Sequence, residues 1–164
     1  MLYCFDSGRH PPDLDGVHTL VRRAFTGRVA VNVDGHSILI ATEETPQVKP
    51  QETFEMLPLP DDVTAVDITC NVCFDSKKDG IAPRRWRTHE AFAMFTDQTG
   101  LKSIDSEIYN LGLLETHKFA IRTAFRIYGE FLVVDRDKFH RAFFNGVGGR
   151  RSYGFGLIVI KKYL

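Results

Sequence analysis

In residues 1–41 the hydrophobic positions follow the spacing of a strand in some segments and the spacing of a helix in another. Residues 2–6 form a short apolar run typical of a strand, and apolar residues recur at helical spacing from Val17 to Phe25. The segments 28–33 and 37–41 have the length and β-branched content of two more strands. The order strand, helix, strand, strand is the first part of a ferredoxin-like βαββαβ unit.

An acidic stretch with four prolines, residues 42–62, separates this unit from a second one. The second unit is expected to contain strands at 63–74, 117–128, 130–134 and 155–160 and helices at 88–95 and 136–144, while residues 96–112 carry no clear period. The pattern predicts an α+β fold of two tandem ferredoxin-like halves, with a glycine-rich loop before the last strand. We expect the halves to span residues 1–57 and 63–164, the first being abbreviated.

The composition is that of an ordinary globular chain of 164 residues, 43% of them hydrophobic and 26% charged, which argues against wholesale disorder. No apolar run approaches the ~20 residues that a membrane helix needs, and the N-terminus lacks the pattern of a secretory signal. Three cysteines without a disulfide-framework spacing fit a reducing compartment. These features predict a cytoplasmic protein with no membrane partner.

The formal net charge of zero conceals an asymmetry along the chain. Residues 1–117 hold 11 Lys/Arg and 18 Asp/Glu, a net of −7, whereas residues 118–164 hold 10 Lys/Arg and 3 Asp/Glu, a net of +7. A basic part of this kind is typical of a surface that binds a polyanion. The alternative is that the two parts attract one another.

Five of the 13 glycines lie within residues 146–156, a segment that we call the glycine loop. Such density lets backbone N–H groups face an anion without obstruction by Cβ atoms. The segment is not a nucleotide-binding P-loop, because it follows a helix and precedes a strand. The loop residues expected to bind a polyanion are Gly146, Gly148, Gly149, Arg150, Arg151, Ser152, Tyr153, Gly154 and Gly156.

Two further basic groups are candidates for phosphate contact. Arg84, Arg85 and Arg87 surround Trp86, a combination that suits phosphate binding with base stacking, although a solvated loop with the tryptophan in the core is an equal alternative. Lys118, Arg122 and Arg126 share parity, so on a continuous strand they would face one side. Cys70 and Cys73 have metal-ligand spacing but lie in an expected strand, where they point to opposite faces, so we expect no metal site.

The sequence GVGGRRSYGFGLIVI, residues 146–160, closely resembles the C-terminal glycine-rich signature of the RAMP superfamily of CRISPR-associated RNA-binding proteins. In that superfamily the signature lies between the last helix and the last strand of a ferredoxin-like domain. The sequence VHTLVRRAF, residues 17–25, resembles the histidine-bearing first helix of the CasE branch, the type I-E repeat-processing nucleases. The resemblance covers most of the chain.

The resemblance implies metal-independent cleavage of CRISPR precursor RNA at the base of the repeat hairpin, which leaves a 2′,3′-cyclic phosphate. It implies that His18 acts as acid or base, a role that an ordinary pKa near neutrality allows, with Arg22 as a catalytic partner. The implied partners are the repeat RNA, bound as the crRNA hairpin, and the other subunits of a type I Cascade complex. No cofactor is implied.

One position departs from the family pattern. CasE proteins that cut RNA often carry a tyrosine three residues before the histidine, where this chain has Asp15. A carboxylate there could orient His18, but it would also repel RNA phosphate. Two alternatives therefore stay open: a RAMP protein that binds the hairpin without cutting it, and an unrelated ferredoxin-like RNA-binding module.

Overall fold

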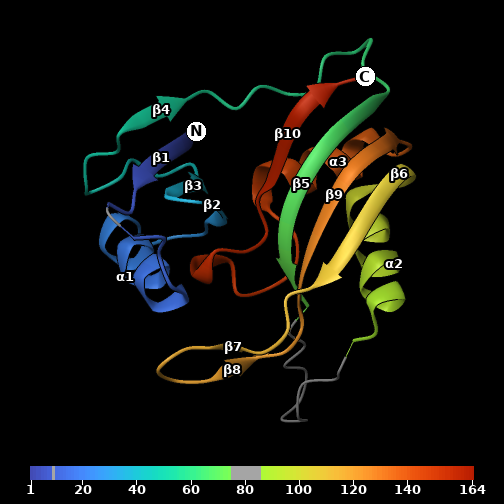
Figure 1. The fold of residues 1–164 in the computed structure, drawn as a ribbon. Helices are drawn as coiled ribbons and strands as arrows, with labels where there is room; N and C mark the ends of the chain where they lie inside the picture. Colours follow the sequence, from blue (N-terminus) through green and yellow to red (C-terminus); the bar gives the residue numbers. More distant parts are fainter. Residues whose placement is uncertain (9, 75–85) are drawn as a thin grey trace.

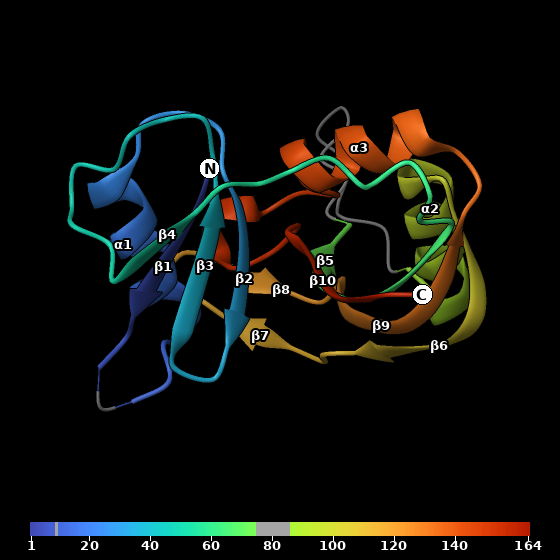
Figure 2. The same cartoon turned by 90° about the horizontal axis from the view of Figure 1, so that it is seen from above.

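The computed structural model describes residues 1–8, 10–74 and 86–164. The first half contains β1 (Leu2–Asp6), α1 (Leu14–Ala24), β2 (Ala30–Asp34), β3 (Ser37–Ala41) and β4 (Glu52–Phe54). Its strands form an antiparallel sheet in the order β2-β3-β1-β4, with α1 beside it (Figures 1 and 2). This is the strand order of a ferredoxin-like unit, but residues 42–51 contain no helix, so the half is abbreviated.

Helix α1 is fixed at its start and along one face. The Asp13 carboxylate accepts a hydrogen bond of 2.7 Å from the Gly16 N–H, which satisfies one of the free donors of the first turn. Val17, Val21 and Ala24 are buried against the sheet. The other positions of α1, which include His18 and Arg22, lie off this buried face.

The second half is a complete βαββαβ unit. It contains β5 (Ala65–Cys73), α2 (Thr88–Thr99), β6 (Leu101–Asn110), β9 (Ala124–Val133), α3 (Arg136–Asn145) and β10 (Ile158–Tyr163). The strands pair antiparallel in the order β10-β5-β9-β6. Helices α2 and α3 cover one face of this sheet (Figure 2). The prediction of two tandem ferredoxin-like halves is thus confirmed.

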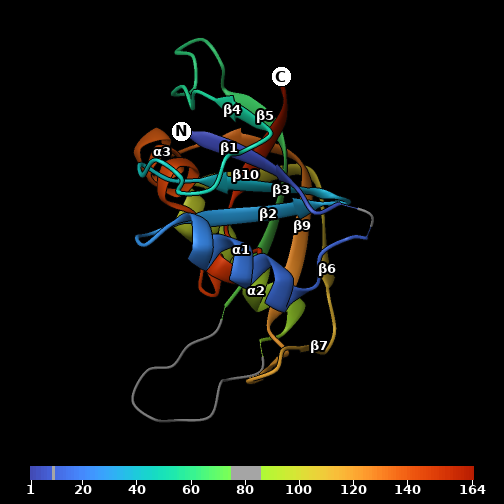
Figure 3. The same ribbon diagram turned by 90° about the vertical axis from the view of Figure 1, so that its left-hand side faces the viewer.

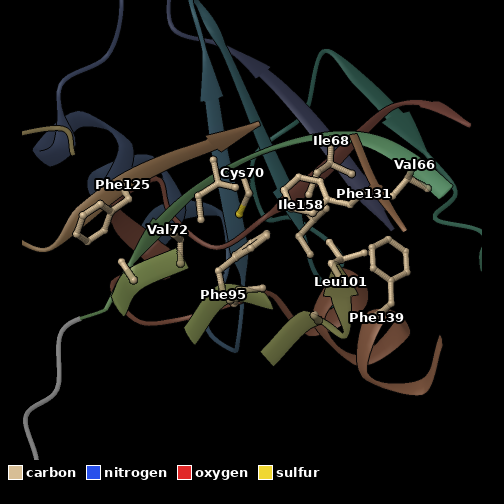
Figure 4. Close-up of a cluster of buried hydrophobic side chains, with 14 of the residues drawn as sticks. Val66, Ile68, Cys70, Val72, Phe95, Leu101, Phe125, Phe131, Phe139 and Ile158 are labelled. Atoms are coloured by element: carbon tan, nitrogen blue, oxygen red, sulfur yellow. The ribbon is translucent and has the colours of Figure 1, made fainter. Parts of the chain in front are cut away.

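The main hydrophobic core lies between the second sheet and its two helices. Alternate residues of β5 point toward the helices, as the period of a strand requires, and the Phe95 and Phe131 rings meet edge to face with their centroids 6.1 Å apart. Figure 4 shows this cluster, whose buried members include Val66, Ile68, Cys70, Val72, Phe95, Leu101, Phe125, Phe131, Phe139 and Ile158.

The two sheets are joined through the segment that precedes β10. The Val31 N–H of β2 donates to the Phe155 carbonyl, and the Leu157 N–H donates to the Val31 carbonyl, both at 3.2 Å. Beside these bonds, the buried Asn71 side chain donates to the Asn32 side chain at 3.2 Å. Figure 3 shows the first sheet in front of the second. The backbone at the end of the glycine loop, residues 155–157, therefore connects the two halves.

A two-stranded hairpin of β7 (Leu114–Glu115) and β8 (Ala120–Ile121) is inserted between β6 and β9. It extends beyond the end of the second sheet on the side of α1 (Figure 1). Its turn is held by Thr116, whose backbone N–H donates to the Phe119 carbonyl at 2.9 Å and whose hydroxyl accepts from the N–H groups of Lys118 and Phe119.

The structure corrects the sequence interpretation in the middle of the second half. The expected strands 117–128 and 130–134 do not exist as such, because β9 runs without interruption through Gly129, and residues 101–110 form the edge strand β6. Gly129 has a φ of 120° and pairs with Ser106, next to a register shift in β6 between Ser103 and Asp105; an added Cβ would come 2.3 Å from the Asp105 carbonyl oxygen. The glycine therefore permits a bulge rather than a turn.

We predict that Gly129→Ala lowers the free energy of unfolding by about 3 kcal/mol, because a Cβ at that position meets backbone atoms of β6 as well as an unfavourable φ. Gly112→Ala is the matched control, since Gly112 has a φ of 75° but no atom within 4 Å of the added Cβ; we expect about 1 kcal/mol there. Urea unfolding of both variants measures the difference, and equal losses would contradict the close contact at Gly129.

Candidate functional site

Three segments that are distant in the sequence meet at the candidate site. They are helix α1 with His18, the glycine loop with its short 3₁₀ helix η1 (Arg151–Tyr153), and the β7–β8 turn with Lys118 and Phe119. Side chains of one buried cluster connect these segments. The cluster contains Cys73, Ile121, Ala124, Tyr153 and Phe155, with Leu14 and Phe119 packed against it. The strand and helix ends of both halves therefore build this site together.

His18 is held by two consecutive residues of η1. Its Nδ1 lies 3.1 Å from the Ser152 hydroxyl oxygen, and its ring is stacked on the Tyr153 ring with centroids 4.1 Å apart and planes at 1°. Contacts at one edge and at one face fix both the position and the rotation of the imidazole. Among the described residues, we find no hydrogen-bond partner for Nε2, so this nitrogen is the one available to a substrate.

The stack continues away from His18. Tyr153 is buried, and the Phe119 ring of the β7–β8 turn meets it edge to face with centroids 5.1 Å apart. The Arg150 guanidinium lies over the Phe119 ring, with Cζ 4.0 Å from the ring centroid, a cation–π geometry. His18, Tyr153, Phe119 and Arg150 thus form one continuous series of ring contacts, from an imidazole to a guanidinium.

The glycines of the loop allow close packing rather than anion binding through their amides. The N–H groups of Gly146, Gly149, Gly154 and Gly156 all donate to backbone carbonyls within the protein. An added Cβ would meet Ala30 of the first sheet at Gly146, and the Cys73 carbonyl oxygen of the second sheet at Gly148, at 2.6 and 2.5 Å respectively. The N–H groups of these four glycines are therefore not free to face an anion.

The two arginines of the loop have different surroundings. Arg150 adopts a φ of 52°, an unusual conformation for a residue with a Cβ, and lies on Phe119. Arg151 is half-buried and donates to the carbonyls of Asn145 and Gly148, so it holds the end of α3 against the loop. Burial, with a smaller contribution from Arg28, lowers the pKa of Arg151. Arg151 is therefore engaged with backbone carbonyls of the loop and of the end of α3.

The surroundings of His18 favour its neutral form. Burial has the largest effect and lowers the pKa of His18, and the charges of Arg22 and Lys118 lower it further. The Asp15 charge and the interaction with Ser152 act in the opposite direction but do not outweigh these effects. Arg22 lies one helical turn after His18 on α1, and Lys118 approaches from the β7–β8 turn. At neutral pH the imidazole can therefore accept a proton.

The basic residues predicted outside the glycine loop do not form one row of side chains. Because no continuous strand spans 118–126, the parity argument for Lys118, Arg122 and Arg126 is wrong: they lie in the β7–β8 turn, between β8 and β9, and on β9. Arg126 donates to the Asn71 side chain at 3.0 Å and lines a cavity of about 240 Å³ between the sheets. Arg87 is exposed at the start of α2, and Arg84 and Arg85 lie outside the described residues.

Within the described ranges, no three His, Cys, Asp or Glu side chains gather in a way that could hold a metal ion. No helix of those ranges is long and apolar enough to cross a membrane.

The site contains two residues that the sequence did not single out, Phe119 and Thr116. An aromatic residue directly after Lys118 was the available signal for Phe119, whereas nothing in the sequence indicates the role of Thr116 in the turn.

The fold and the site together define a tandem ferredoxin-like protein with a glycine loop packed against a histidine of the first helix. The family model described as "CRISPR associated protein" matches residues 114–162, from β7 to β10. Cas6e from Escherichia coli K-12 has a similar structure, with a TM-score of 0.71 and 13% identity over 97% of each chain. The resemblance to the CasE type is thus confirmed at the level of the fold.

Two other solved structures are similar over most of their length. Cse3 from Thermus thermophilus, bound to an RNA that represents a pre-cleavage complex, has a TM-score of 0.66 and 14% identity over 92% of this chain and 89% of that chain. A chain of a CRISPR RNA-guided surveillance complex has a TM-score of 0.65 and 16% identity over 98% and 97% of the two chains. A search of curated protein sequences finds no match.

We predict that Lys118→Gln raises the pKa of His18, because it removes a positive charge that disfavours the imidazolium. Lys161→Gln, on the exposed part of β10, is the control and should leave the pKa of His18 unchanged. Titration of the His18 ring protons by NMR measures both. An unchanged His18 pKa in Lys118→Gln would show that the β7–β8 turn does not lie beside α1 in solution.

Proposed function

We propose that this protein is an endoribonuclease that cleaves CRISPR precursor RNA at the base of the repeat hairpin. One observation carries the proposal: His18 is stacked on Tyr153 and bonded to Ser152 of the glycine loop, within a fold shared with Cas6e. A histidine that is oriented at its edge and at its face, with cations beside it, is suited to proton transfer at a phosphate.

The similar structures support RNA as the substrate. The Thermus thermophilus Cse3 structure holds an RNA that represents a pre-cleavage complex, and a second structure of the CRISPR endoribonuclease Cse3 holds a 19-nucleotide RNA. Another similar chain belongs to a CRISPR RNA-guided surveillance complex. By this likeness, the protein acts in the cytoplasm, binds the repeat hairpin, and stays on the mature crRNA as a subunit of a Cascade complex.

In the proposed reaction the 2′-hydroxyl next to the scissile phosphate is the nucleophile. Nδ1–H of His18 donates to the Ser152 hydroxyl, which leaves Nε2 as the base that removes the proton of the 2′-hydroxyl. The oxygen attacks the phosphorus, the bond to the 5′-oxygen breaks and that oxygen takes up a proton from solvent water, and the product is a 2′,3′-cyclic phosphate. Because the nucleophile belongs to the substrate, no metal-bound water is required for this step.

The cations around His18 supply the second contribution. Arg22 and Lys118 are close enough to lower the pKa of His18, and positive charge near the phosphate stabilises the extra negative charge of the transition state. Arg150, which lies over the Phe119 ring, adds a further positive charge on the glycine loop. The role of Arg22 is therefore electrostatic rather than that of an acid, since an arginine side chain does not give up its proton in proteins.

Binding without cleavage is the second candidate, and the effect of Asp15 on His18 favours it. Asp15 is close enough to His18 to raise its pKa, so its negative charge also acts on a phosphate bound there. Incubation with a labelled cognate repeat RNA in excess EDTA separates the two candidates: we predict that the protein cleaves this RNA and yields a 2′,3′-cyclic phosphate. Activity that requires added magnesium would refute the proposed chemistry, and tight binding without cleavage would support the second candidate.

We predict that His18→Ala slows single-turnover cleavage by about 10²–10⁴-fold, because a positioned proton acceptor is lost. Hairpin binding, measured by gel shift, should change little, since it depends on many phosphate contacts. His36→Ala is the control; His36 lies beside the β2–β3 turn, where its ring contacts the Gly8 carbonyl. A wild-type cleavage rate in His18→Ala would remove His18 from the mechanism.

In the wild type, the cleavage rate should fall as the pH decreases below the ordinary histidine pKa near 6.5, because the base becomes protonated.

A further inference from the structure

Asp15 connects α1 to the β7–β8 turn. It is the second residue of α1, and its Oδ2 accepts a hydrogen bond of 2.9 Å from the backbone N–H of His117, 102 residues later in the chain. The same oxygen lies 3.8 Å from His117 Nε2. The Asp15 side chain is 27% exposed and the His117 side chain 89% exposed. An exposed ion pair contributes little to stability, so the backbone hydrogen bond is the significant contact.

The turn that Asp15 holds carries Lys118. Its internal hydrogen bonds to Thr116 keep residues 116–119 in one conformation. On one side of Lys118, Phe119 packs between Tyr153 and Arg150 of the glycine loop. On the other side, the His117 N–H is bonded to Asp15. The turn is therefore attached to the glycine loop and to α1, with Lys118 between the two attachments.

We infer that Asp15 is a positioning residue, whose carboxylate holds the β7–β8 turn against α1 and thereby sets the position of Lys118 relative to His18. The catalytic consequence rests on the proposed function, whereas the contact itself does not. In this role the carboxylate accepts a hydrogen bond from the backbone N–H of His117.

The role can be distinguished from simple charge repulsion by the sign of the effect. If Asp15 only repelled RNA, its removal would strengthen binding and leave or raise the cleavage rate. If Asp15 positions the turn, Asp15→Ala releases Lys118 and the rate falls. Asn retains a side-chain oxygen that can accept from the His117 N–H, so Asp15→Asn should preserve the position of the turn while it removes the charge.

The experiment compares four variants of the full chain by single-turnover cleavage of the repeat hairpin and by amide hydrogen exchange. Asp15→Ala should slow cleavage by about tenfold or more, because a small displacement of a charged group at the reacting centre has a large effect on rate. Asp15→Asn should stay within about threefold of the wild type, since the acceptor remains. Two control variants should also stay within about threefold of the wild-type cleavage rate. His117→Ala keeps the backbone N–H, and Asp13→Asn removes an equal charge from the same end of α1.

Amide exchange tests the contact independently of cleavage. In Asp15→Ala the His117 amide should exchange faster, by about tenfold or more, while amides of β5 and β9 keep their protection. Asp15→Ser, whose shorter side chain has one oxygen where the carboxylate has two acceptor oxygens, is the second variant if Asp15→Ala does not fold. Unchanged His117 exchange, or faster cleavage in both Asp15→Ala and Asp15→Asn, would overturn the inference. If the wild type does not cleave the RNA but the His117 amide still exchanges faster in Asp15→Ala than in the wild type, the proposed function is refuted and the contact between Asp15 and His117 is supported.

Discussion

The contact of His18 with Ser152 and Tyr153 is the interaction on which the rest of the site depends. It joins residues 134 positions apart in the chain and brings the first half onto a loop of the second. Because Ser152 holds the imidazole at its edge and Tyr153 supports its face, the orientation of His18 follows the shape of the glycine loop. That shape depends in turn on close approaches to both sheets, at Ala30 and at the Cys73 carbonyl. The packing of the two halves therefore determines the local geometry of the histidine.

The sequence predicted those parts of the fold whose hydrophobic pattern is set by one buried face. Helix α1 buries Val17, Val21 and Ala24, so its period was visible, and β5 alternates because one face packs on α2 and α3. Strand β6 was missed because it lies at the sheet edge and most of its side chains are exposed, which leaves no period. Gly129 indicated a turn because a bulge and a turn place the same demand on the backbone.

The candidate site was only partly predictable, for a physical reason. Glycine density and the histidine helix are local signals, and both segments contribute to the site. The partners of these segments depend on tertiary packing: neither the bond from the His117 N–H to Asp15 nor the position of Phe119 between Tyr153 and Arg150 has a local signature. The same holds for Arg151, whose basic side chain suggested anion binding but donates to the backbone at the end of α3.

The cations beside His18 have two effects that are opposed in the free protein and reconciled in the proposed complex. Without RNA, Lys118 and Arg22 lower the pKa of His18 and keep the imidazole neutral, but they also make it a weaker base. A phosphate bound between these cations and His18 brings negative charge that offsets theirs, so the pKa of His18 moves back toward its ordinary value. The imidazole then gains basicity at the moment when the 2′-hydroxyl is in reach. In this arrangement, the charges that attract the substrate weaken the base only while the site is empty.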